Sequence, residues 1–129
     1  MMLPDFSQLD RAGLTRWGGG LAPAAEAARS HGLRFLPADL GDVADKSQLL
    51  QTLAKSLQLP PYFGRNWDAL ADCIEDDDWI GPSGSVILVA HSQAYRKDHP
   101  ADWAVLEGIF TDAADYWREK RKPLWILVD

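Results

Sequence analysis

The sequence contains a single cysteine, Cys73, and lacks any long apolar run. One cysteine cannot form an intramolecular disulfide, so the cytoplasm is the expected compartment. No stretch approaches the roughly 18 apolar residues of a membrane span. Residues 1–13 have neither a basic segment nor a continuous apolar run, so no signal peptide is expected.

Basic residues are also scarce. Lys and Arg number 13 against 19 Asp and Glu, which gives a formal net charge of −6. Non-specific binding to nucleic acid depends on Lys and Arg that displace counterions, so this balance argues against a direct nucleic-acid partner. It favours a basic partner instead, including a protein that itself binds nucleic acid.

Sequence motifs of catalysis and metal binding are missing as well. There is no Gly-x-Ser-x-Gly, phosphate-loop or dinucleotide-binding motif. His31, His91 and His99 are scattered, and no His-x-x-x-His or Cys-x-x-Cys spacing is present. Cys73 stands beside Ile74 on an apolar helix face, where a small core residue is expected rather than a nucleophile. We therefore expect no catalytic residues, no metal and no cofactor.

What the sequence does contain is a regular alternation of apolar runs and amphipathic segments over 129 residues, the size of one domain. This alternation predicts an α/β fold, with a small three-stranded, mostly parallel sheet packed with helices. Pro37 weakens one strand, because proline cannot donate to a central ladder. The predicted strands are residues 33–40, 85–90 and 124–128, and the predicted helices are residues 22–30, 45–57, 66–76, 93–97 and 102–120.

The first part of the chain is harder to interpret. Residues 1–21 carry apolar side chains that need to pack somewhere, and Gly18-Gly19-Gly20 then breaks any regular element. Residues 1–32 are therefore assigned to an N-terminal extension of unknown role, and residues 33–129 to the main domain.

The most informative segment is residues 59–78, LPPYFGRNWDALADCIEDDD. Asp68 and Asp72 are four residues apart and so lie on one face of the predicted helix. Between residues 62 and 78 there are six acidic residues and one basic residue, Arg65. The run from Glu75 to Asp78 falls near the predicted helix C-terminus, where the helix dipole disfavours acids. Either this face is merely solvated, or an external partner stabilises it.

The order of residues in LPPYFGRNWDALADCI, positions 59–74, resembles the signature of the barstar family, the intracellular inhibitors of barnase-type ribonucleases. The resemblance extends over residues 33–129. It implies that an acidic helix and the aromatic loop before it enter the nuclease active site, with carboxylates in place of RNA phosphates. Asp72 corresponds to the principal acid of the family. The partner-binding residues implied by the resemblance are Tyr62, Phe63, Asn66, Asp68, Asp72, Ile109 and Asp112.

Several positions depart from the family prototype. Phe63 lacks a tyrosine hydroxyl, Arg65 stands in place of an acid, Ala71 in place of a tryptophan, and Asp112 in place of a glutamate. These departures point to a ribonuclease or ribonuclease-toxin partner other than barnase itself. The expected protein is therefore a non-enzymatic cytoplasmic inhibitor or immunity protein, as in toxin–antitoxin pairs, monomeric when free.

Two other functions stay open at this stage. A regulatory interaction domain of the same fold would bind a basic protein that is not a nuclease. A carboxylate–metal hydrolase would use the Asp68 and Asp72 pair, although no further convergent ligands accompany it.

Overall fold

The computed structural model describes residues 2–61 and 63–129. The chain forms a four-stranded sheet in the order β1-β4-β3-β2, and every neighbouring pair of strands is parallel. The strands are β1 (Leu14–Arg16), β2 (Arg34–Asp39), β3 (Ser85–Ala90) and β4 (Leu124–Val128). The predicted α/β class with a parallel sheet is confirmed, but the sheet has one strand more than the three expected.

The additional strand is β1, from the segment whose role the sequence left unassigned. Leu14 pairs with Ile126 and Arg16 with Val128, so β1 extends the sheet beyond β4. It is only three residues long, directly follows Gly13, and is partly exposed. Three residues are too few to show the alternation of apolar and polar side chains by which a strand is predicted, so this strand was not predicted from the sequence.

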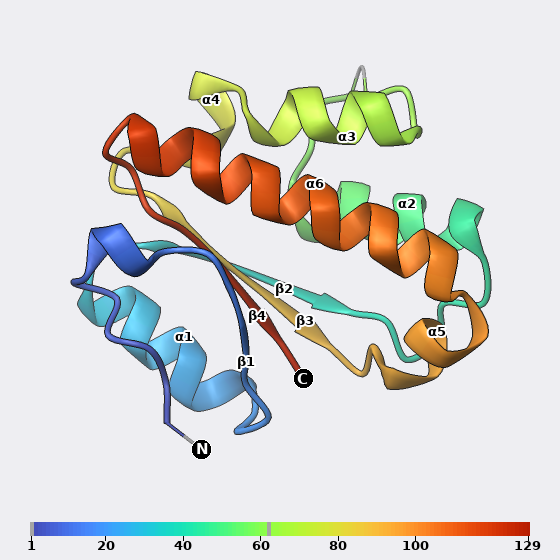
Figure 1. Ribbon diagram of the computed structural model, residues 1–129, viewed down its shortest axis with the longest axis horizontal. Coiled ribbons are helices and arrows are strands. Elements are labelled where there is room, and N and C mark those ends of the chain that lie inside the picture. Colours follow the sequence, from blue (N-terminus) through green and yellow to red (C-terminus); the bar gives the residue numbers. More distant parts are fainter. Residues whose placement is uncertain (1, 62) are drawn as a thin grey trace.

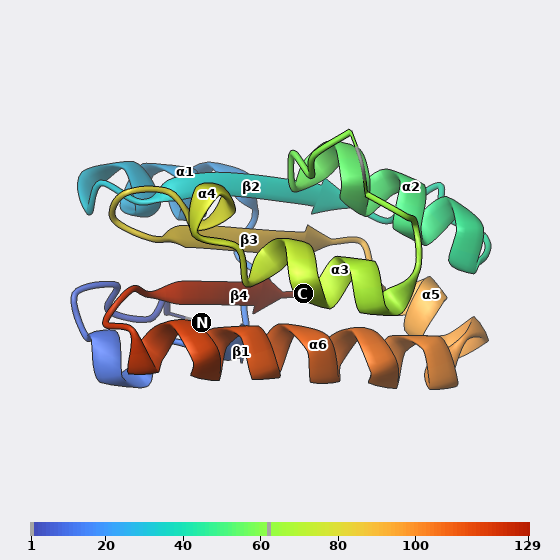
Figure 2. The same ribbon diagram turned by 90° about the horizontal axis from the view of Figure 1, so that it is seen from above.

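Helices cover both faces of the sheet (Figures 1 and 2). α1 (Leu21–Ser30) lies alone on one face, while α2 (Lys46–Ser56), α3 (Trp67–Ile74) and α6 (Pro100–Glu119) lie on the other. Three short helices complete the fold: η1 (Leu9–Arg11), α4 (Asp77–Ile80) and α5 (Gln93–Asp98). Within the described residues, no helix is long and apolar enough to cross a membrane.

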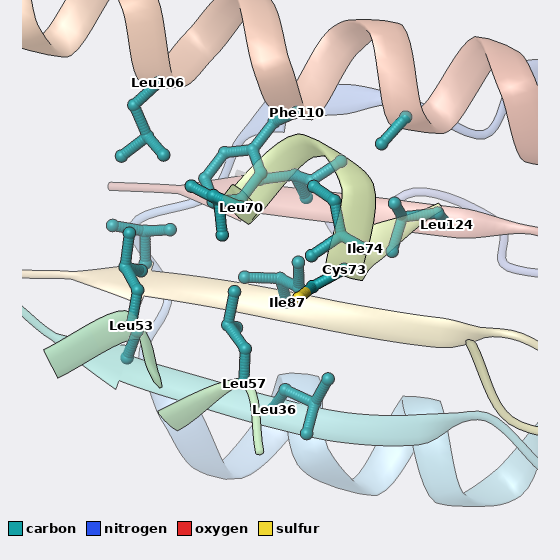
Figure 3. Packing of buried hydrophobic residues seen from close by; sticks show 14 of the residues in the cluster. Leu36, Leu53, Leu57, Leu70, Cys73, Ile74, Ile87, Leu106, Phe110 and Leu124 are labelled. Atoms are coloured by element: carbon teal, nitrogen blue, oxygen red, sulfur yellow. The ribbon is translucent and has the colours of Figure 1, made fainter. Parts of the chain in front are cut away.

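The larger core lies between the sheet and α2, α3 and α6. Ile87 points into it from the sheet, and Leu53, Leu70 and Phe110 meet it from the three helices (Figure 3). Ile126 of β4 belongs to the same cluster. All five side chains are fully buried. Each removes apolar surface from water, which is the main favourable contribution to folding.

A second core lies beneath α1 on the opposite face. Phe6, Trp17 and Ala28 from the first 32 residues pack against the alternate side chains of the strands, among them Leu88 and Trp125. The centroids of the Phe6 and Trp125 rings are 5.3 Å apart. The N-terminal segment thus covers a sheet face that would otherwise be apolar and exposed.

Pro37 is accommodated because β2 is an edge strand. β2 pairs only with β3, so the missing N–H of Pro37 faces away from the ladder.

Candidate protein-binding site

The acidic helix α3 begins where Asn66 caps it. The Asn66 side-chain oxygen accepts a hydrogen bond from the Ala69 N–H at 2.8 Å, while its own backbone is extended. This satisfies one of the N–H groups that the first helical turn leaves without a partner. Arg65, immediately before, has a φ of +55°, a left-handed conformation that turns the chain into the helix.

α3 has a buried face and an acidic face. Leu70, Cys73 and Ile74 point toward the sheet, and Figure 3 shows them above Ile87 and Leu57. Asp68 and Asp72 lie on the opposite side and are exposed. Burial of the first face fixes the orientation of the helix, so the two carboxylates are held facing solvent.

Cys73 behaves as a core residue. Its side chain is 7% exposed. Burial raises the pKa of the Cys73 thiol, and the carboxylates of Asp72 and Asp76 raise it further. A thiol that stays protonated is a poor nucleophile.

The predicted single helix over residues 66–76 is wrong at its end. α3 stops at Ile74, and α4 begins after Asp76, whose side chain accepts a hydrogen bond from the Asp78 N–H at 2.8 Å. Asp77 and Asp78 therefore occupy the first turn of a new helix, where the dipole favours acids rather than opposing them. Local capping accounts for Asp76, Asp77 and Asp78, so these residues do not by themselves indicate a partner.

Glu75 links α3 to α6. Burial raises the pKa of the Glu75 carboxyl, with further contributions from the negative charges of Asp112 and Asp72. The carboxylates of Asp72 on α3 and Asp112 on α6 therefore both act on Glu75, which directly follows α3. In the sequence, Glu75 was treated as part of the acidic run at residues 75–78. Its spacing of three residues from Asp72 and seven from Asp68 instead places these three side chains on one helix face.

α6 contributes the second half of this surface. Ile109 is half-buried against the core, and Asp112, three residues later, is exposed. The Trp117 indole N–H donates to the Ile74 carbonyl at 2.7 Å, which ties α6 to the end of α3. Because of this bond, Asp72 and Asp112 are carried by helices whose relative position is fixed.

The aromatic loop before α3 is less exposed than expected. Phe63 is 9% exposed and belongs to the main core, so most of its ring is unavailable to a partner. Tyr62 lies outside the described residues. α4 is tied to the end of α2, ahead of this loop, since the Trp79 indole N–H donates to the Leu57 carbonyl at 2.7 Å.

The three exposed acids of this surface, Asp68, Asp72 and Asp112, have no ion-pair partner within the part of the chain that the structure describes. The described residues also include no group of three or more His, Cys, Asp or Glu side chains placed to hold a metal ion. The arrangement is that of a rigid anionic surface spanning two helices, suited to binding cationic groups.

Comparison with protein families agrees with this geometry. A family model described as Barstar (barnase inhibitor) matches residues 33–129, which covers β2 through β4 and most of the chain. The chain belongs to the barstar family. No curated protein matches it at a significant level. At the level of the family, the role is inhibition of a barnase-type ribonuclease rather than catalysis. β1 and α1 lie outside the segment that the barstar model matches, whereas the core beneath α1 combines residues from both parts of the chain.

Proposed function

We propose that this barstar-family protein is a cytoplasmic inhibitor, or immunity protein, of a basic ribonuclease or ribonuclease toxin. The contact consists of Asp68 and Asp72 of α3 and Asp112 of α6. The adjoining surface of Asn66 and Ile109 completes it. Tyr62 and the exposed part of Phe63 extend it. The carboxylates occupy positions that RNA phosphates take in the nuclease cleft.

The observation that carries this proposal is the exposed acidic surface shared by α3 and α6. The repulsion of the Glu75 carboxylate by Asp112 and Asp72 is a cost in the free protein. A cluster of Lys, Arg and His in a nuclease cleft would convert this repulsion into attraction. Long-range attraction between a basic cleft and this surface would also accelerate association.

The decisive experiment is to isolate the tightest protein partner from the cell of origin and assay its ribonuclease activity with and without this protein. Dose-dependent inhibition at a one-to-one ratio is expected. A tight partner without nuclease activity would overturn the proposal and favour a regulatory interaction domain of the same fold.

Asp72→Ala provides the local test. Removing one member of a desolvated charge pair leaves its partner buried and uncompensated, at a cost of about 2–5 kcal/mol in affinity. Glu26→Ala is the matched control, because Glu26 is an exposed acid on α1, across the sheet from α3. Equal affinities for the two variants would show that α3 is not the binding surface.

A further inference from the structure

The carboxyl edge of the sheet contains a feature unrelated to α3. Since all strands are parallel, β2, β3 and β4 end together at Asp39, Ala90 and Val128. The chain leaves β1 for α1 on one face and leaves β3 for α5 and α6 on the other face (Figure 1). In open α/β sheets, ligands bind at this kind of crevice, where neighbouring connections diverge.

A cavity of about 530 Å³ lies at this point. Both diverging connections line it. The connection after β1 contributes Trp17, Gly18, Gly20 and Leu21, and the connection after β3 contributes His91 and Gln93. Sites for small molecules typically measure about 300–1,000 Å³. The connection after β1 lies outside the barstar-matched segment, so the cavity depends on the N-terminal extension of this chain.

The cavity has an apolar floor. Leu88 and Pro37 line it from the sheet, and Leu21 lines it from the start of α1 with half of its side chain exposed. The Trp17 ring is fixed beside them, because its indole N–H donates to the Gly20 carbonyl at 2.9 Å. A Cβ on Gly19 would come within 2.2 Å of that ring, so glycine is required there.

The rim of the cavity holds the carboxylates of Asp39 and Asp129 together with the His91 imidazole, whose pKa the Asp39 carboxylate raises. The Asp39 carboxylate accepts the Gly41 N–H at 2.9 Å and lies 2.9 Å from His91 Nδ1. These contacts hold the pKa of Asp39 below its ordinary value. The second carboxylate is that of Asp129, which accepts the His91 N–H at 2.5 Å. His91 adopts a left-handed φ of +55°, and the two carboxylates hold it there.

Lysine and arginine are absent from the described lining. Arg16 and Arg96 both donate to the main-chain oxygen of Asp129 at 2.9 Å, rather than reaching Asp39. Gly18 to Gly20 followed by the start of α1 superficially suggests a phosphate loop. Asp39 and Asp129 beside that loop would instead repel a phosphate.

We propose that this cavity binds a small organic amine with an apolar body. The ammonium group bonds Asp39 at the rim, while the apolar body displaces water from Leu88, Pro37 and Leu21. This site is separate from the proposed nuclease contact, since it lies at the carboxyl edge of the sheet and no residue of α3 or α6 is among its described lining.

The test is an NMR titration of the full chain with phenethylamine, 2-phenylethanol and 3-phenylpropionate, which carry positive, no and negative charge respectively. We expect saturable shifts of the Trp17 indole and the Gly20 and His91 amides with phenethylamine. The alcohol should bind more weakly and the carboxylate should not saturate. Equal binding of the alcohol, or no saturable binding of phenethylamine, would overturn the proposal.

Two variants identify the contact residues. Asp39→Asn should weaken phenethylamine binding by about tenfold or more, since it removes a charged hydrogen bond. Asp42→Asn removes one exposed acid from the following loop and should leave binding unchanged. Leu21→Arg places a cation and bulk at the mouth, where the side chain is already exposed, and should abolish binding. Unchanged affinity in both Asp39→Asn and Leu21→Arg would show that the amine binds elsewhere.

Discussion

The side chain of Asn66 determines where the acidic helix begins. Its oxygen accepts the Ala69 N–H, and the rest of the side chain is exposed, so the bond can be removed without opening the core. Asn66→Ala should lower the free energy of unfolding by about 1 kcal/mol, the usual cost of losing a cap. Urea denaturation followed by circular dichroism measures this change.

Asn66→Asp is the matched control, because aspartate caps helices about as well as asparagine. It should unfold close to the wild-type midpoint. If Asn66→Ala were equally stable, the cap would contribute nothing and the start of α3 would have to be fixed by Leu70 and Ile74 packing alone.

Glu75 is expected to destabilise the free protein at neutral pH. Its folded-state pKa is raised by burial and by Asp112 and Asp72. A raised carboxyl pKa means that the folded state holds this proton more tightly than the unfolded state does, so stability falls as pH rises from the unfolded pKa through the folded one. Glu75→Gln should therefore stabilise the protein at pH 7 by about 0.2–0.5 kcal/mol, as for like-charge neighbours on a partly exposed surface.

This gain should disappear as the pH falls below the ordinary range of glutamate, where Glu75 is protonated in both states. Glu119→Gln is the control, since Glu119 is an exposed acid at the end of the same helix as Asp112. Thermal unfolding of the variants across pH 3–8 would reveal the difference. A stabilisation by Glu75→Gln that persists at low pH would show that packing, not charge, is responsible.

Individual residues differ in how far the sequence revealed their surroundings. The helical spacing of Leu70 and Ile74 correctly predicted a buried face, so Asp68 and Asp72 were correctly expected on one side. Phe63 was predicted as a contact, yet its ring lies in the core. Its burial arises from packing within the main core, a long-range effect that no local pattern records.

The N-terminal elements cover one whole face of the sheet. Val86, Leu88, Trp125 and Leu127 would lose this cover if residues 1–32 were removed. A chain beginning at Leu33 should therefore aggregate, because a large exposed apolar patch favours association. Size-exclusion chromatography and binding of a hydrophobic dye measure this outcome.

A second truncated chain with Leu88→Lys and Leu127→Lys tests the cause. These substitutions make the uncovered face polar, and they should restore a monomer with the helices of the opposite face intact. A monomeric, cooperatively folded chain without the substitutions would contradict the expectation and show that residues 33–129 need no cover.

The main strands and helices were predictable because the strands include uninterrupted apolar runs, as in β3, and the helices have apolar residues at helical spacing, as in α6. β1 was not, since its three residues acquire their conformation by pairing with β4. The break between α3 and α4 was also missed. Neither Glu75 nor Asp76 is a residue type that by itself ends a helix. The hydrogen bond by which Asp76 caps α4 can be identified only from the three-dimensional structure.

The molecule as a whole is electrically asymmetric. Of its net charge of −6, most arises from the segment between Phe63 and Asp78. The exposed acids Asp77 and Asp78 of α4 lie beside the proposed contact surface without the burial of Glu75. If they only attract a basic nuclease from a distance, their charges affect the association rate and leave the dissociation rate alone.

The double variant Asp77→Asn and Asp78→Asn should therefore lower the association rate constant on the order of threefold at low salt. The difference should vanish near 1 M salt, where the Debye length is about 3 Å. Stopped-flow fluorescence with the isolated nuclease measures both rates. Asp10→Asn with Glu26→Asn removes the same charge from η1 and α1, outside α3 and α4, and should change association less. A faster dissociation in the α4 variant would mean that these carboxylates touch the partner, and the contact surface would then extend from α3 and α6 onto α4.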